Sequence, residues 1–354
     1  MEHIMNSADR VFTALRGGEP DRVPIIEFVV DEKIRRALFP EAAEVGAFCE
    51  AIGLDAVGCG LEFQRQRQNG DRYYDEWGVL YQASPETLSH PVRGPIVTRE
   101  DLKTYRPPDP DAPWRLGQLP SLVERFKGKK AIIVHHRAAF MWSAYLVGLD
   151  NLLLYFAADP DFAHALLDQV LAANIAMVRR AVRAGAEMIS LGDDYAHNFA
   201  PMMSPTHFQE FIYPRLRRMV EAIHEEGALC IKHSDGYLWP ILDMILAAGP
   251  DAINPLEPVA GMDMGEVKAY CGKRVCLIGN IDCGALLSHG TVAAVEASVR
   301  QCIAAGAPGG GFILSSSNSI HSSVNPQNYL AMVRAGQKYG NYPLDTELLR
   351  TGTP

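Results

Sequence analysis

The feature that most constrains this chain is a series of eight short apolar segments, most of them separated by helix-length amphipathic patterns. Phe162 to Ala184 and Thr291 to Ala305 are two such helical patterns. The apolar segments span residues 23–26, 55–57, 131–135, 187–191, 228–231, 251–253, 275–278 and 311–314. Strands that alternate with helices favour a parallel sheet, and eight of them predict an α/β fold of the (β/α)8 barrel type.

Between the second and third apolar segments the alternation stops. The stretch Asp75 to Tyr81 is typical of a hairpin, and Tyr105 to Pro113 is an extended connection stiffened by prolines. We therefore expect one barrel domain over residues 1–354. Residues 60–120 would form an insertion after the second strand that partly covers the barrel mouth.

The composition excludes several classes of protein. A chain of 354 residues with 48% hydrophobic and 21% charged residues can bury a large core. The net charge of −9 and the lack of a Lys/Arg run argue against nucleic-acid binding. No apolar stretch approaches bilayer-spanning length and the N-terminus does not resemble a signal peptide, so we expect no membrane association. Seven dispersed cysteines without CxxC pairs predict a reduced, cytoplasmic protein.

In a barrel of this type the chemistry sits at the carboxyl ends of the strands. Nearly every predicted strand brings a polar group to that rim. These groups are Glu27, Asp55, Cys59, His135, His136, Asp193, Asp194, His233, Asp235, Asn254, Glu257, Asn280, Asp282, Cys283 and Asn318. One Asp or Asn after a strand often only caps the next helix, and for Asp194, Asn280 and Asp282 we weigh capping and catalysis equally. The convergence of the whole set predicts an active site.

The most informative motif is Lys232-His-Ser-Asp-Gly236, which follows the apolar segment 228–231. His233 and Asp235 are two residues apart, so both project toward the barrel mouth. There they bind a metal, share a proton with a bound substrate, or form a mutually satisfied pair. Catalytic zinc takes three protein ligands and an open position, and Asp193 or Glu257 is the candidate for the third ligand.

Six other motifs lie in order along almost the whole chain. They are Asp75-Glu-Trp-Gly78, Asp159-Pro-Asp161, Phe208 to Pro214, Gly279-Asn-Ile-Asp282, Gly309 to Leu314 and Asn325-Pro-Gln-Asn-Tyr329. Together they resemble the uroporphyrinogen decarboxylase superfamily. The resemblance implies a (β/α)8 barrel whose members include true decarboxylases and corrinoid-dependent methyltransferases. The rim residues must decide between these activities, because one fold hosts many functions.

The residues that decarboxylases need are mostly missing. The family's decarboxylases carry an Arg-Gln-Ala-Gly-Arg motif on the first strand to bind a polycarboxylate, whereas this chain has acids there and no arginine before Arg35. Their His-Gly pair after the last strand is Asn318-Ser319 here. Asp55 matches the aspartate with which the decarboxylases contact the pyrrole nitrogens of their substrate. This chain lacks two of these decarboxylase features and keeps one, so we treat decarboxylation as the alternative function.

The methyltransferase branch is the better resemblance. Its thiol-methylating members hold zinc with His-x-Cys-Gly and a final Cys, which are His233-x-Asp235-Gly and Asn318 here. A nitrogen and oxygen site suits an oxygen substrate better than a thiol. The resemblance thus points to the O-demethylase methyltransferases, which move a methyl group from aryl methyl ethers to cobalamin on a corrinoid protein. This chain lacks the Asp-x-His-x-x-Gly motif of corrinoid carriers, so a separate corrinoid protein is the expected partner.

We thus expect a methyltransferase that takes the methyl group of a small O-methyl donor, with an aryl methyl ether as the first candidate. The expected catalytic residues are His233, Asp235, Asp193 and His136. The expected substrate-binding residues are Glu27, Asp55, His135, Tyr195 and Asn318, and the expected zinc ligands are His233, Asp235 and Glu257. The alternatives are a decarboxylase of uroporphyrinogen or a smaller acid, and a non-catalytic binding barrel. The resemblance also allows a homodimer.

Overall fold

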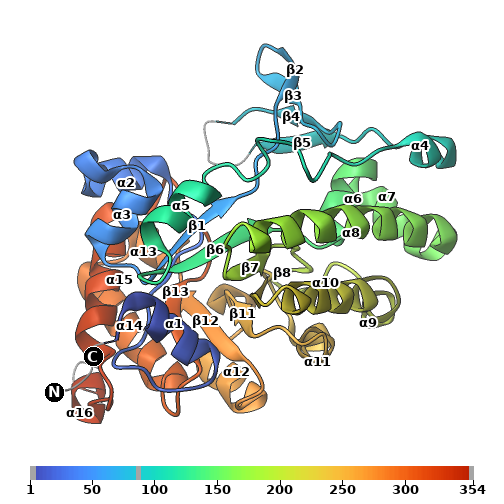
Figure 1. The fold of residues 1–354 in the computed structure, drawn as a ribbon. Helices are drawn as coiled ribbons and strands as arrows, with labels where there is room; N and C mark the ends of the chain where they lie inside the picture. The colour runs from blue at the N-terminus through green and yellow to red at the C-terminus, as the bar shows by residue number, and fades with distance from the viewer. Residues whose placement is uncertain (1–4, 85–88, 351–354) are drawn as a thin grey trace.

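The centre of the fold is a parallel sheet of seven strands that curls into a barrel wall (Figure 1). The computed structural model describes residues 5–84 and 89–350. In spatial order the strands are β1 Ala56–Gly60, β6 Ala131–His136, β7 Met188–Leu191, β10 Leu229–His233, β11 Ala252–Asn254, β12 Cys276–Ile281 and β13 Phe312–Ser316. Each coincides with a predicted apolar segment to within a few residues.

The first predicted strand fills the gap between β13 and β1. Ile25 forms an isolated parallel bridge with Leu314, and the Ile26 N–H donates to the Leu314 carbonyl at 3.1 Å. On its other side the Ile25 carbonyl accepts the Asp55 N–H at 2.8 Å. The segment is too short and irregular for a full strand, but it completes the ring of backbone hydrogen bonds.

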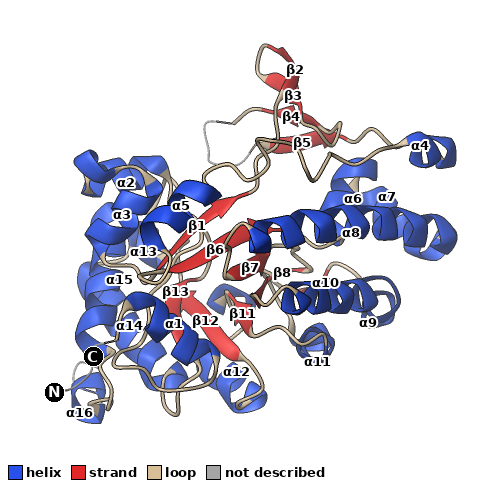
Figure 2. Ribbon diagram, viewed as in Figure 1, coloured by secondary structure: helices blue, strands red, loops and turns tan. Residues whose placement is uncertain are grey.

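Helices cover the outside of this sheet (Figure 2). The helices that follow or precede barrel strands are α3 Val45–Ile52, α5 Leu119–Phe126, α6 Phe140–Val147, α7 Leu149–Ala158, α8 Pro160–Arg183, α10 Tyr213–Glu225, α11 Leu242–Ala247, α12 Met264–Cys271, α14 Val292–Gly306 and α15 Pro326–Tyr339. The shorter elements are α1 Ser7–Leu15, α2 Glu32–Leu38, α4 Arg99–Thr104, α9 Pro205–His207, α13 Leu286–His289, α16 Thr346–Arg350, the 3₁₀ helices η1 Pro40–Ala42, η3 Trp239–Ile241 and η4 Pro258–Ala260, and the π-helix η2 Phe208–Ile212. Within the described residues no single helix is long and apolar enough to cross a membrane, and α6 with α7 reaches that composition only as a pair bent by 101°.

The interior of the barrel is a small apolar cluster of its own. Inward residues of the strands, among them Ala131, Ile133 and Ile231, pack with Val11 and Leu15 of α1. Because the α1 side chains pack against these inward strand residues, α1 closes the amino end of the barrel. The cavity that the strand ends line lies at the opposite, carboxyl end.

The segment between β1 and β6 forms a separate antiparallel sheet. Its strands are β2 Gln66–Asn69, β3 Arg72–Tyr74, β4 Leu80–Gln82 and β5 His90–Arg93. The hairpin predicted at 75–81 is confirmed, since it joins β3 to β4. Trp77 in this hairpin stacks on Trp142 of α6 with 4.5 Å between the ring centroids. A second small pair, β8 Ala196–His197 with β9 Ala200–Pro201, follows β7.

Asp55 lies at the wrong end of the barrel for the role predicted from the sequence. It precedes β1, is fully buried, and pairs with the guanidinium groups of Arg10 at 2.7 Å and Arg22 at 2.9 Å. Its second oxygen accepts the Ile25 N–H at 2.8 Å. Asp55 therefore fixes α1 and the 23–26 segment to β1, and the prediction that it binds substrate at the mouth is wrong.

Replacing Asp55 tests this structural role. Asp55→Asn removes the carboxylate partner of Arg22 and one of the two carboxylate partners of Arg10, which keeps Asp21 at 2.6 Å. Because the site is buried, we expect the free energy of unfolding to fall by about 3–5 kcal/mol. Urea unfolding followed by circular dichroism measures it. Glu32→Gln, which breaks an exposed pair with Arg36, is the control and should cost less than about 1 kcal/mol. An Asp55→Asn protein as stable as the parent would contradict the assignment.

Candidate active site

Successive side chains of a strand point to opposite faces, and this alternation sorts the residues at the end of β6. Ala131 and Ile133 belong to the interior cluster, so His135 faces the mouth. His136 borders the cavity, but its ring bonds to the helix layer, where the Nε2 lies 3.0 Å from the Asn174 amide oxygen. Burial lowers the pKa of His136 to about 3. His136 is thus a neutral residue bonded to α8, and the geometry does not support its predicted catalytic role.

The same alternation sorts the residues after β7. Ser190, Gly192 and Asp194 line the mouth, whereas Asp193 points to the helix layer. The Asp193 carboxylate accepts the N–H groups of Ala139 and Phe140, both at 2.9 Å, at the start of α6. This buried carboxylate caps a helix and does not reach the mouth, so its predicted catalytic role is not supported.

Tyr195 is also outside the mouth. Its ring is fully buried and packs against Phe140 and Phe208. The Lys232 Nζ lies 4.1 Å from the ring centroid and donates to the Asp193 carbonyl at 2.6 Å. Tyr195 therefore supports the loop after β7, and the prediction that it binds substrate is wrong.

The mouth itself contains a cavity of about 420 Å³. Its walls combine aromatic rings with convergent polar groups from several strands. The lining residues are Phe28, Val29, Gly60, Leu61, Phe63, His135, His136, Arg137, Trp142, Ser190, Gly192, Asp194, His233, Asp235, Asn254, Pro255, Ser316, Asn318 and Ser319. A cavity of this size and mixed character accommodates a small aromatic molecule.

His233 is held in one orientation by Asn254. Its Nδ1 lies 2.6 Å from the Asn254 Oδ1, and the Asn254 Nδ2 donates to the Ile278 carbonyl at 3.3 Å. Since the amide nitrogen is already used, the amide oxygen accepts the Nδ1 proton. The Nε2 is left facing Asp235 at 3.5 Å and Asp194 at 3.7 Å. This arrangement fixes the tautomer, as in metal-binding histidines.

Asp235 has one satisfied and one unsatisfied oxygen. Its Oδ2 accepts the Asn318 Nδ2 at 2.6 Å, which places Asn318 at the mouth as predicted. Its Oδ1 is buried and has no hydrogen-bond partner among the described residues. Burial raises the pKa of Asp235 to about 6, with His233 opposing the shift and Asp194 adding to it. A buried acceptor without a donor is costly unless a ligand or an ion satisfies it.

Three side chains meet closely enough to hold one ion. Asp194, His233 and Asp235 each offer a ligand atom, and these atoms lie within 4.8 Å of one another. Glu257, the predicted third ligand, instead accepts the Gly236 N–H at 3.1 Å and is not part of this group. One imidazole and two carboxylates are a donor set that zinc accepts, with a fourth position open to a substrate.

His135 completes the floor of the mouth as a neutral imidazole. Burial lowers its pKa to about 4, with His233 adding to the shift. Gly58 makes this position available, because a Cβ there would lie 2.7 Å from the His135 Nε2. That Nε2 is buried and has no partner among the described residues. His135 therefore offers a hydrogen-bonding group to a bound molecule, in line with its predicted substrate-binding role.

Glu27 lies just behind the cavity wall. Its Oε1 accepts the Ser316 N–H at 2.9 Å, and its Oε2 lies 2.8 Å from the Ser316 hydroxyl. That hydroxyl also bonds to the Asn318 carbonyl. One hydroxyl proton cannot serve both oxygens, so a protonated Glu27 satisfies the contact. Burial raises the pKa of Glu27 to about 8, which agrees. Glu27 reaches the cavity through Ser316 and does not line it.

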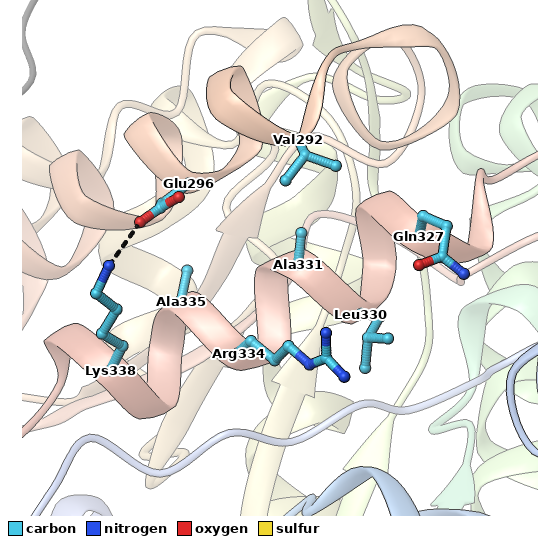
Figure 3. A pocket seen from close by; sticks show the side chains of 8 residues that line it. All are labelled: Val292, Glu296, Gln327, Leu330, Ala331, Arg334, Ala335 and Lys338. Carbon is cyan, nitrogen blue, oxygen red and sulfur yellow. Dashed lines mark hydrogen bonds and ion pairs between the residues drawn. The ribbon is translucent and has the colours of Figure 1, made fainter.

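A pocket of about 260 Å³ between α14 and α15 offers no comparable chemistry (Figure 3). Its one acid, Glu296, bonds to Lys338 at 3.2 Å and to Tyr339. None of its lining residues is His or Cys. The groups suited to catalysis are therefore those of the barrel mouth.

The sequence interpretation missed one residue of the mouth and one role. It did not consider Arg137, and it placed Asp194 at the rim without giving it a ligand role, although both line the cavity. The strand periodicity indicated both residues. Arg137 follows His135 by two residues, and Asp194 follows Ser190 by four, so each lies on the same face as an inward residue. Counting in steps of two from the inward strand residues would have identified both.

Comparisons with known proteins agree with this fold. Residues 83–339 match the family described as uroporphyrinogen decarboxylase (URO-D). The uroporphyrinogen decarboxylase of Geobacter sulfurreducens is 25% identical over 258 residues, covering 70% of this chain and 71% of that protein. The methylated-thiol–coenzyme M methyltransferase of Methanosarcina mazei is 25% identical over 252 residues, covering 69% of this chain and 64% of that protein. A solved methyltransferase from Methanosarcina mazei has the same fold, with a TM-score of 0.72 and 20% identity over 95% of this chain and 99% of that one.

The pKa of Glu27 predicts a pH-dependent stability. The pKa of this carboxyl is about 8 in the folded protein, against an ordinary value of 4.5 in the unfolded chain. Its protonation therefore stabilises the fold fully below about pH 4.5. That contribution is lost as the pH rises through 8. We expect Glu27→Gln to flatten the decline in unfolding free energy between pH 5 and pH 8.5, measured by urea titration.

Glu296→Gln is the matched control for this prediction. Bonds to Tyr339 and Lys338 lower the pKa of Glu296, so its contribution is constant over the same pH window. It should keep the slope of the parent protein. A Glu27→Gln protein with the parent's slope would show that the Glu27 carboxyl is not protonated in the fold.

Proposed function

The chain belongs to the uroporphyrinogen decarboxylase family, and from that premise we propose that it is a methyltransferase. It moves a methyl group from an O-methyl donor, an aryl methyl ether, to cobalamin on a separate corrinoid protein. The observation that carries this proposal is the group of Asp194, His233 and Asp235 at the barrel mouth. A site with nitrogen and oxygen donors beside an aromatic-walled cavity suits an aryl ether.

The charge of the mouth argues against a polycarboxylate substrate. Of the described lining residues only Arg137 carries a fixed positive charge, whereas Asp194 and Asp235 are acids. A porphyrinogen needs several cations around its carboxylates, and two acids at the same rim would repel them. Decarboxylation of a smaller acid stays the second candidate, since the relatives include decarboxylases.

The chemical problem is the leaving group, because an aryloxide is difficult to expel from a methyl group. A zinc ion held by Asp194, His233 and Asp235 would act as a Lewis acid for the ether oxygen. Asn254 keeps the Nε2 of His233 turned to that point, and Asn318 holds Asp235 in place. Without a metal, the same His233 beside two carboxylates is oriented to donate a proton to the departing oxygen.

The walls of the cavity would orient the donor. Phe28, Phe63 and Trp142 offer ring faces and edges to an arene, and their apolar surface excludes water from the ether oxygen. The methyl group would then point out of the mouth toward the corrinoid of the partner protein. Residues 60–120 would form an insertion that partly covers the mouth. Residues 1–354 would together form one barrel domain.

Methyl transfer can be measured directly. The protein is incubated with cob(I)alamin and methoxylated aromatics, and we expect the absorbance of methylcobalamin to appear. Carbon dioxide release from uroporphyrinogen without methyl transfer would reverse the ranking in favour of decarboxylation. A protein inactive in both assays and free of metal by elemental analysis would be a binding barrel.

The metal ligands are tested by metal content. We expect His233→Ala, Asp235→Ala and Asp194→Asn to lose bound zinc after dialysis against a fixed free zinc concentration. Asn254→Ala should weaken zinc binding by about 10–100-fold, because the histidine loses the group that orients it. Glu257→Gln is the control and should keep the metal content of the parent. Equal loss in the Glu257 variant would overturn this choice of ligands.

A further inference from the structure

Arg137 is a cation in the cavity that forms no ion pair with a described carboxylate. Asp193 feels its charge, but the Asp193 carboxylate is bonded to the N–H groups of Ala139 and Phe140. Arg137 follows the last residue of β6 and lies two residues beyond His135, so it faces the mouth. It is the only Lys or Arg among the described residues that line the cavity. Its guanidinium rests near the rings of Trp142 and Tyr145, 5.7 Å from each centroid. Contact with two rings fixes the group in place.

The arginines whose side chains are buried have acid partners, whereas the half-buried Arg137 has none in the described part of the chain. Arg10 pairs with Asp55 at 2.7 Å, and Arg115 pairs with Glu76 at 2.5 Å. Arg137 makes no hydrogen bond or ion pair with any described residue, and its Nε is buried. Arg137 as a whole is half-buried, and its buried Nε is costly unless an acceptor satisfies it. Its acceptor must therefore come from water or from a bound molecule.

A second unsatisfied donor lies beside it. The indole Nε1 of Trp142 is buried and has no acceptor among the described residues. Trp142 lines the same cavity and is fixed by stacking on Trp77, 4.5 Å away, and by Phe63, 5.4 Å away. One wall of the cavity thus holds two donor residues without acceptors. Guanidinium groups match planar carboxylates, which accept two parallel hydrogen bonds.

The pair His233 and Asp235 lies two strands away from Arg137. Arg137 follows β6, whereas His233 ends β10 and Asp235 comes after it, and β7, which Asp194 follows, lies between these two strands. Two strand spacings are roughly 10 Å. One substituted aromatic ring bridges such a gap. A carboxylate is attracted by Arg137 and repelled by Asp235 and Asp194, so it binds most favourably at the end of the cavity nearest Arg137 and farthest from Asp235.

We propose that Arg137, assisted by the indole N–H of Trp142, binds a carboxylate on the ring of the substrate. This inference rests on the proposed function and narrows it: the donor is a methoxylated aromatic acid, and neutral aryl ethers are poor donors. The carboxylate lies at Arg137 and the methoxy oxygen at His233. Arg137 is thereby the residue that determines substrate specificity and sets which end of the ring reaches the His233 group.

Binding of benzoate and benzamide by calorimetry tests the proposal. The two probes have nearly the same shape and differ in charge, and the protein is first treated with chelator so that no metal binds the carboxylate. We expect the parent protein to bind benzoate about 10–100-fold more tightly than benzamide, the range expected for hydrogen bonds between charged groups. Equal binding of the two probes by the parent protein overturns the proposal without any variant.

Variants assign the preference to Arg137. Arg137→Met should abolish it, and Arg137→Lys should retain only part of it because an ammonium lacks the planar pair of donors. Trp142→Phe keeps the charge and should weaken benzoate binding several-fold. Arg93→Met removes an exposed arginine of β5 and is the control for net charge. A full preference in folded Arg137→Met protein, checked by its thermal transition, overturns the proposal.

The binding assay needs neither a corrinoid nor a methyl group, so it separates this inference from the proposed function. A protein that prefers benzoate but transfers no methyl group overturns the proposed function alone. A protein that demethylates 4-methoxytoluene as fast as 4-methoxybenzoate overturns the role of Arg137 alone.

Discussion

The alternation of side chains along the barrel strands determines which residues of this protein can do chemistry. Inward residues at the amino end form the packed interior closed by α1, and the same face continues at the carboxyl end as the cavity wall. His135, Asp194 and His233 are on that face. Their neighbours His136 and Asp193 are on the other face and bond to the helix layer. A shift of one residue in any strand would exchange the two sets.

Hydrogen bonding distinguishes Asp55, at the amino end of the barrel, from the polar groups of the mouth. At the amino end Asp55 uses both oxygens on Arg10, Arg22 and the backbone, so nothing remains for a ligand. At the mouth, the Oδ1 of Asp235 and the Nε of Arg137 are buried and have no hydrogen-bond partner among the described residues. Because both atoms border the cavity, a bound molecule can satisfy them there.

Much of the fold was predictable, and the site was predictable in part. Seven of the eight apolar segments are strands, because a strand buried on both faces is short and continuously apolar. The first segment is only a bridge, since its hydrogen bonds come from two distant strands. Within the site, His233 and Asp235 were found together because they are two residues apart on one strand. Placing Asp55 at the mouth failed because the residue precedes its strand and lies at the opposite end.

The sequence by itself determined the barrel, the end at which its chemistry lies, and the pair His233 and Asp235, because these depend on local periodicity. Tertiary structure alone decided that Asp194 joins the pair in place of Glu257, since the two acids come from different loops with no fixed offset. It also decided that Asn318 supports Asp235 and that Arg137 has no acid partner. Contacts between strands depend on how the sheet curls, and no spacing along one chain segment encodes that curvature.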